Sequence, residues 1–163
     1  MDHDIDDTLL ASLNLRRSDG PGGFNITIPS KTNIARNTVE RYAAEKPEQL
    51  ALIFEDEDLS LRTWTFAELD RDASRIAHGL VGLGIGRGDR VALHTGMLPE
   101  TGIMHMALYK LGAIAVTLSQ LYGADTLAHI LNHAEAVAIV TQDHAWKQFR
   151  GREDEFPTLK HHI

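Results

Sequence analysis

Apolar residues in the second half of the chain form short continuous runs that alternate with amphipathic stretches. The runs 90–94, 113–118 and 137–141 lack polar alternation, which is typical of strands buried on both faces. Between them, 99–111 and 127–134 repeat apolar residues at helical spacing. This order predicts an α/β fold with a three-stranded parallel βαβαβ sheet, right-handed crossovers and flanking helices.

The first half of the chain predicts a helix, a β-hairpin and a longer helix. The first helix is expected from Asn33 to Lys46, because Pro47 disfavours helical backbone in the residue before it. Runs 50–54 and 62–65 read as two strands joined by an acidic turn. The first 23 residues are acidic and then turn-rich, so we expect residues 1–23 to be a flexible tail and 24–163 to be the folded part.

The longer helix has a clear start signal. Thr65 and Glu68 have the spacing of a capping box, in which each side chain bonds to the backbone of the other residue. Trp64 and Leu69 occupy the positions of a hydrophobic staple. A last short helix is expected after Asp143.

Composition excludes several classes of function. The 163 residues hold 16 Lys and Arg against 23 Asp and Glu, a net charge of −7, which argues against nucleic acid or an anionic membrane as partner. No apolar run approaches the ~20 residues of a membrane span, and the N-terminus lacks signal-peptide features. We therefore expect a cytoplasmic protein. The chain has no cysteine, which excludes disulfides and thiolate chemistry.

Common catalytic and metal motifs are missing. The glycine-rich run 79–88 leaves a helix and enters a strand, opposite to a dinucleotide loop, so we interpret it as a structural connection. There is neither a Gly-Lys pair for a phosphate loop nor a GxSxG elbow. His129 and His133 have i, i+4 spacing without a third ligand, so an ordinary solvated helix face is favoured over a metal site.

Ligands of parallel sheets bind beyond the carboxyl ends of the strands. These ends are expected at 94–98, 119–123 and 142–150, and the first two lead directly into helix N-termini, whose free N–H groups can bind anions. Lys147 and Arg150 lie three residues apart in the last short helix. From the residues alone, plain loops and a solvated basic pair remain open beside phosphate contacts.

Five stretches in order resemble the N-terminal part of AMP-forming acyl-CoA synthetases, members of the adenylate-forming ligase superfamily. Their order and spacing match over about residues 33–163, and 34–41 and 118–123 resemble the short- and medium-chain enzymes in particular. The five stretches are Pro47 with Leu50-Ala51-Leu52-Ile53-Phe54, Trp64-Thr65-Phe66-Ala67-Glu68-Leu69, Gly88-Asp89-Arg90-Val91-Ala92-Leu93, Leu108-Tyr109-Lys110-Leu111-Gly112-Ala113 and Ile139-Val140-Thr141.

The resemblance implies a function for a longer protein. Such enzymes activate a carboxylic acid with ATP and Mg²⁺ to an acyl-adenylate and transfer the acyl group to CoA. Their phosphate loop, acyl pocket and adenylation lysine would lie beyond residue 163, so residues 24–163 would be a truncated part of the large AMP-binding domain. We expect this chain alone to hold no catalytic residue, to bind no cofactor and to be inactive, and its unpaired strand edges to favour self-association.

The resemblance also places a CoA site on this chain. Ser119, Gln120 and Leu121 fall on the turn beside the pantetheine passage, and Lys147 and Arg150 fall on two basic positions that contact the CoA nucleotide. Relatives carry glycines in place of Gln120 and Leu121, and arginine in place of Lys147. A lysine is a point charge and lacks the bidentate geometry of arginine.

Two other interpretations remain. The chain is alternatively a stand-alone, non-catalytic interaction or regulatory module that keeps the scaffold. A flavodoxin-like nucleotide binder is a weaker alternative, because residues 95–98 make a poor phosphate loop.

Overall fold

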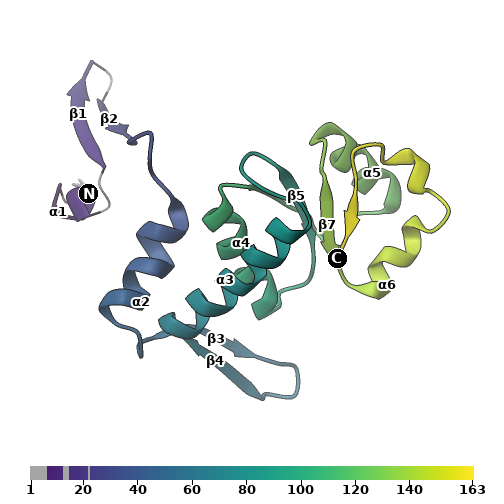
Figure 1. Cartoon of the computed structure of the whole chain (residues 1–163), viewed down its shortest axis with the longest axis horizontal. Helices are drawn as coiled ribbons and strands as arrows, with labels where there is room; N and C mark the ends of the chain where they lie inside the picture. The colour runs from purple at the N-terminus through teal and green to yellow at the C-terminus, as the bar shows by residue number, and fades with distance from the viewer. Residues whose placement is uncertain (1–6, 13–14, 22) are drawn as a thin grey trace.

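The computed structural model describes residues 7–12, 15–21 and 23–163 (Figure 1). The elements before the central sheet are α1 (Asp7–Ser12), β1 (Arg16–Gly20), β2 (Gly23–Thr27), the π-helical turn η1 (Arg36–Glu40), α2 (Arg41–Glu45), β3 (Leu50–Glu55), β4 (Leu61–Thr65) and α3 (Phe66–Gly82). The sheet and its helices follow as β5 (Arg90–His94), α4 (Pro99–Leu111), β6 (Ile114–Thr117), α5 (Ala124–His133), β7 (Ala138–Thr141), α6 (Asp143–Trp146), the 3₁₀ turns η2 (Lys147–Phe149) and η3 (Glu153–Glu155), and β8 (His161–His162).

The central sheet has the strand order β6-β5-β7-β8, and all neighbouring strands are parallel. The predicted α/β class and parallel βαβαβ arrangement are confirmed. The predicted number of three strands is one too few. The fourth strand, β8, is two histidines long, and it carries no apolar run that would indicate a strand.

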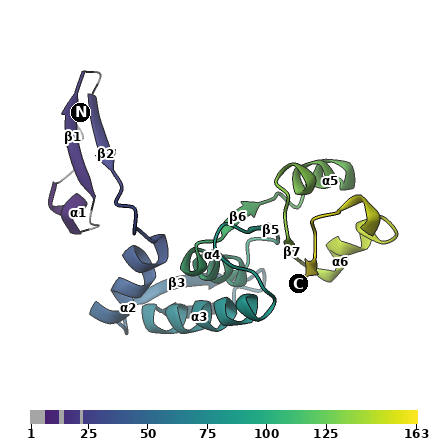
Figure 2. The same cartoon turned by 45° about the horizontal axis from the view of Figure 1, so that its top comes forward.

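The N-terminal segment lies apart from the central sheet in both views (Figures 1 and 2). The tail expected over residues 1–23 includes α1 and β1, while residues 1–6, 13–14 and 22 lie outside the described part. Gly23 pairs with Gly20 across an antiparallel hairpin, so the boundary expected at residue 23 falls within that hairpin. Of the residues that carry the turn signals, Ser18 to Gly20 belong to β1 and Gly23 begins β2, and the flexibility of the segment stays a prediction.

The predicted helix starts and hairpin agree with the structure. The helix expected over 33–46 corresponds to η1 and α2, and β3 pairs antiparallel with β4. The capping box at α3 is confirmed, because the Thr65 hydroxyl accepts from the Glu68 N–H at 3.2 Å and the Glu68 carboxylate accepts from the Thr65 N–H at 2.9 Å. Asp143 is the first helical residue of α6, one position after the observed cap Gln142.

The sheet is covered on both faces, as parallel sheets require. Helices α3 and α4 cover one face, where their apolar residues pack against Val91 and Leu93 of β5. Helix α5 and the α6–η2 segment cover the other face, where they pack against Ala92 and Ile139. The alternation of residues 91 to 93 between two apolar layers explains why the strands read as continuous apolar runs.

A partly buried ion-pair network joins η1 to helices α3 and α4. The Lys110 ammonium of α4 lies 2.7 Å from carboxylate oxygens of both Glu40 and Asp70. Burial alone would lower the pKa of Lys110, but hydrogen bonds to the two carboxylates outweigh it and raise the pKa above its ordinary value. The lysine is therefore charged at neutral pH and ties η1, α3 and α4 together.

Candidate functional site

The carboxyl ends of β5 and β6 open onto a cleft of about 700 Å³. Three segments line it: residues 52–54 of β3, residues 95–105 of the β5–α4 connection and α4, and residues 117–121 at the end of β6. Its polar groups come from Thr95, Thr101, His105, Thr117, Ser119 and Gln120. The cleft lies where parallel sheets bind ligands.

The β5–α4 wall of the cleft is fixed by side-chain hydrogen bonds. The Thr101 hydroxyl donates to the Gly96 carbonyl at 2.9 Å, so its oxygen accepts from the Thr95 hydroxyl at 2.8 Å. The His105 Nδ1 donates to the Thr101 carbonyl at 2.8 Å, because a carbonyl only accepts. In the neutral ring, Nε2 then accepts from the Thr117 hydroxyl at 3.0 Å, which links α4 to β6.

The turn after β6 forms the opposite wall. The Ser119 carbonyl accepts from the Tyr122 N–H at 3.2 Å, and the Ser119 hydroxyl oxygen accepts from the Leu121 N–H at 3.2 Å. The Leu121 side chain is 94% exposed, so the turn presents an apolar side chain to solvent. The predicted residues Ser119, Gln120 and Leu121 thus all line the cleft.

Gln120 joins three of the loops at this edge of the sheet. Its amide Nε2 donates to the Gln142 Oε1 at 2.6 Å, which connects the turn to the N-cap of α6. Its Oε1 lies 3.1 Å from the position that a Cβ would take on Gly96, so a side chain at that position would press on it. The glycine therefore allows the close approach of Gln120.

The predicted basic residues lie on the exposed side of the α6–η2 segment. Trp146 and Phe149 turn inward, where Phe149 is fully buried and packs edge-on against Phe156 with a 5.4 Å separation of ring centroids. Lys147 and Arg150 are exposed, and in the part of the chain that the structure describes their side chains form neither an ion pair nor a hydrogen bond. The aromatic pair therefore fixes the segment and leaves both cations available.

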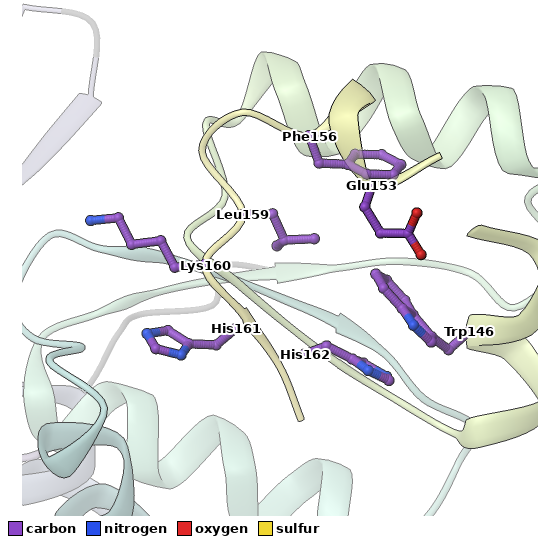
Figure 3. Close-up of a pocket in the computed structure, with 7 residues that line it drawn as sticks. All are labelled: Trp146, Glu153, Phe156, Leu159, Lys160, His161 and His162. Carbon is purple, nitrogen blue, oxygen red and sulfur yellow. The ribbon is translucent and has the colours of Figure 1, made fainter. Parts of the chain in front are cut away.

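A small pocket of about 120 Å³ lies on the inner side of this segment (Figure 3). The Trp146 ring stacks on the His162 ring with centroids 4.0 Å apart, whereas the Lys160 side chain extends away from them. The stacking joins α6 to β8. This pocket is separate from the larger cleft, since the two share no lining residue.

The structure brings the two predicted groups to one edge of the sheet but not into one cavity. The turn 119–121 follows β6 and the basic segment follows β7, with β5 between them. Neighbouring strands lie about 4.8 Å apart, so the two strand ends are separated by about 10 Å. Lys147 and Arg150 do not line the cleft, and the Gln120–Gln142 hydrogen bond connects the turn 119–121 to the start of the basic segment.

His94, at the end of β5, is the one polar residue that is buried within the described residues. Its Nδ1 lies 3.2 Å from the Thr141 hydroxyl oxygen, and this hydroxyl donates to the His94 carbonyl at 3.0 Å. Its position between β7 and the turn after β6 was not predicted, and neither were the roles of Gln142 and Gly96.

The histidine pair on α5 is exposed, and its ring centroids lie 6.0 Å apart. Within residues 7–12, 15–21 and 23–163, no group of three or more His, Cys, Asp or Glu side chains is placed to hold a metal ion. In the same part of the chain, no helix combines the length and apolar character needed to cross a membrane.

The fold and the cleft define a class: parallel α/β proteins that bind ligands at the carboxyl edge of a sheet covered on both faces. Residues 39–162 match the profile of a family described as AMP-binding enzyme. The chain belongs to this family. The resemblance identified from the five sequence stretches is thereby confirmed.

Relatives and solved structures agree with this assignment. Acetyl-coenzyme A synthetase from Deinococcus radiodurans is 32% identical over 122 residues, which cover 74% of this chain and 19% of the relative. The enzyme of the same name from Thiobacillus denitrificans is 36% identical over 111 residues, which cover 68% of this chain and 17% of the relative. The chain therefore spans less than a fifth of the length of these curated relatives.

Among solved structures, the anthranilate CoA ligase AuaEII in complex with anthranoyl-AMP matches 83% of this chain and 25% of its own, with a TM-score of 0.73 and 26% identity. A fatty acyl CoA synthetase from Mycobacterium tuberculosis matches 80% of this chain and 26% of its own, with a TM-score of 0.72 and 25% identity. The predicted fold, part of the large N-terminal domain of adenylate-forming ligases, is confirmed.

Proposed function

We propose that this chain is the N-terminal part of an AMP-forming acyl-CoA synthetase that acts on a short- or medium-chain carboxylic acid. The observation that supports this best is the similarity of residues 39–162 to AMP-binding enzymes, with acetyl-coenzyme A synthetases among the relatives. The whole protein would form an acyl-adenylate from ATP and the acid, with Mg²⁺, and would then transfer the acyl group to CoA. This chain supplies scaffold and one wall of the CoA entrance.

The exposed cations fit the nucleotide part of CoA. Lys147 and Arg150 stand one helical turn apart on a segment that Phe149 anchors, and no carboxylate neutralises them among the described residues. Charge-assisted hydrogen bonds to phosphate are the strong kind, and two adjacent cations suit a phosphorylated nucleotide. The chain as a whole carries a net charge of −7, so this basic pair is a local exception that a phosphate group would select.

The cleft suits the uncharged pantetheine arm of CoA better than a triphosphate. Its lining in the described residues consists of apolar side chains and polar groups, without lysine or arginine. A triphosphate needs cations and Mg²⁺ around it. We therefore assign the ATP phosphates, and with them the adenylation chemistry, to the rest of the protein, and the pantetheine arm of CoA to the turn 119–121.

Kinetics of the whole protein test the assignment of Lys147 and Arg150. The variant with both residues changed to Ala is expected to raise KM for CoA about tenfold, the factor that corresponds to 1.4 kcal/mol. Acid-dependent pyrophosphate release without CoA should stay unchanged. The matched control changes the exposed cations Lys31 and Arg75 to Ala and should alter neither quantity. An unchanged KM for CoA in the Lys147/Arg150 variant would contradict the assignment.

A further inference from the structure

The neutral ring of His94 leaves one of its two buried nitrogens without a hydrogen bond. The side chain is 1% exposed, and its Nε2 is buried without a hydrogen-bond partner among the described residues. Unsatisfied buried polar groups are rare in folded proteins and need a physical explanation. This one lies at the carboxyl edge of the sheet, next to the turn that the proposed CoA site uses.

The hydrogens around the ring determine which nitrogen is protonated. The Thr141 hydroxyl has a single hydrogen, which it donates to the His94 carbonyl at 3.0 Å. Its oxygen, 3.2 Å from Nδ1, can then only accept, so Nδ1 carries the hydrogen of the neutral ring. Nε2 is left as a bare acceptor. Leu118, the residue before Ser119, donates its N–H to the Leu93 carbonyl at 2.9 Å, and the Ser119 main chain is the backbone group whose hydrogen bonding favours a protonated ring.

Protonation of the His94 ring gives Nε2 a hydrogen that it can donate. With hydrogens on both nitrogens, Nδ1 keeps its bond to Thr141 and Nε2 becomes a donor. The Ser119 carbonyl has two lone pairs and uses one for the Tyr122 N–H, so it has one left for this donor. Burial opposes the charge of the protonated ring, and hydrogen bonding to the Ser119 main chain favours it.

We propose that His94 is the positioning residue of the turn 119–121. The neutral ring leaves the turn held by its own hydrogen bonds, and the protonated ring draws Ser119 toward β7 through a new Nε2 bond. Because Gln120 of this turn bonds to Gln142 at the start of α6, the move changes the spacing between the turn and the basic segment. That this spacing matters for CoA rests on the proposed function; the movement itself does not.

The surroundings of His94 determine the pH at which its ring is protonated. Burial lowers the pKa of His94 below its ordinary value of 6.5, the Ser119 main chain opposes this, and the charge of His144 on α6 adds to the lowering. On the elements that cover this face, the titratable groups include the exposed Asp143 of α6 and, on α5, Asp125 and the two exposed histidines; Arg152 donates to the Asp125 carboxylate at 2.9 Å. Protonation of His94 is therefore expected at a lower pH than that of an ordinary histidine.

NMR of the 163-residue chain with ¹⁵N-labelled histidine tests the proposal without any ligand. At pH 7.5 the His94 ring should be the neutral Nδ1–H tautomer. On acidification, the backbone amide signals of Ser119, Gln120 and Leu121 should shift with the same midpoint as the ring, below that of an ordinary histidine. An Nε2–H tautomer at pH 7.5, or turn signals that do not follow the ring, would overturn the proposal.

Four variants separate positioning from mere packing. His94→Gln retains a donor near the Nε2 position without titrating, so its turn signals at pH 7.5 should resemble those of the wild type at low pH. His94→Leu should abolish the pH dependence. His144→Gln should raise the pH midpoint of the turn signals without changing the size of their shift. His129→Gln, on the outer face of α5, should change neither the midpoint nor the size of the shift.

Persistence of the full pH-dependent shift of the turn signals in His94→Leu or His94→Gln would refute the proposal. Because these experiments contain no CoA, a negative result would not contradict the proposed function. Likewise, an unchanged KM for CoA in the kinetic test would not contradict the proposed movement of the turn.

Discussion

The two edges of the central sheet are built in opposite ways. At the amino edge, Arg90 of β5 closes the end of α5, since its guanidinium donates to the carbonyls of Ala134 and Glu135 at 2.8 Å. At the carboxyl edge, Met97 and Leu121 are almost fully exposed and His94 has a buried nitrogen without a partner. One edge satisfies its polar groups, and the other leaves groups for a ligand or for further polypeptide.

The largest expected effect concerns the anchor of the basic segment. Phe149→Ala removes a fully buried ring that packs against Phe156 and Trp146, and should lower the free energy of unfolding by about 4 kcal/mol. Urea denaturation measures the loss. The control Gln148→Ala changes an exposed neighbour and should cost little. A loss below about 1 kcal/mol in Phe149→Ala would show that the ring does not fix the segment.

The closed amino edge can be opened by one substitution. Arg90→Ala leaves two carbonyls at the end of α5 without their donor, and we expect a loss of about 2 kcal/mol in the free energy of unfolding. Hydrogen exchange should show increased opening of the last turn of α5. Protection equal to that of the wild type would mean that water replaces the guanidinium at no cost.

The buried histidine makes stability depend on pH. The pKa of His94 is lowered in the folded state, so the unfolded chain takes up the proton at higher pH. Its contribution is fully present above about pH 6.5 and is lost as the pH falls toward the folded-state pKa. Thermal unfolding of His94→Leu should show a smaller loss of stability between pH 7.5 and 5 than the wild type. Parallel curves for the two proteins would contradict this.

A small increase in the free energy of unfolding is expected when backbone strain at the amino edge is relieved. Glu135 adopts a positive φ of 48° after α5, where a residue with a side chain is disfavoured. Glu135→Gly should raise the free energy of unfolding by about 0.5 kcal/mol, because the relief of strain exceeds the loss of an exposed ion pair with Arg90. Leu59→Gly in the β3–β4 turn, at φ 65°, is the matched variant and should also stabilise. Destabilisation by both would count against strain as the cause.

Substitution of the exposed apolar residues at the carboxyl edge should affect self-association of the chain more than its stability. Met97 and Leu121 are 96% and 94% exposed, and we predict that the isolated chain self-associates through this edge. Replacing both with Gln should shift the chain toward monomer in analytical ultracentrifugation and leave the unfolding midpoint nearly unchanged. A wild-type chain that sediments as a monomer at every concentration would disprove the prediction.

Local signals in the sequence predicted the elements well because they involve neighbouring residues. The capping box of Thr65 and Glu68 and the helix from Pro99 to Leu111 are set by spacing within a few residues. The Gln120–Gln142 bond was not predictable, because it joins residues 22 apart through the strand order β6-β5-β7.

The site was predictable only in part for the same reason. The order of the strand ends placed the turn 119–121 at the carboxyl edge, where it lines the cleft. Whether Lys147 and Arg150 share that cavity depends on how Trp146 and Phe149 pack, which the spacing of charges does not contain. The positions of His94 and Thr141 as strand neighbours likewise follow from the parallel register.

The most direct test of the account is pyrophosphate release by the whole protein in the presence of ATP, Mg²⁺ and a panel of short- and medium-chain carboxylic acids. The account predicts release that depends on the acid, with CoA thioester formed when CoA is added, and no release from the 163-residue chain alone. Acid-independent release, no release with any acid, or full activity of the isolated chain would contradict the assignment of this chain as a scaffold whose reactive groups lie elsewhere in the protein.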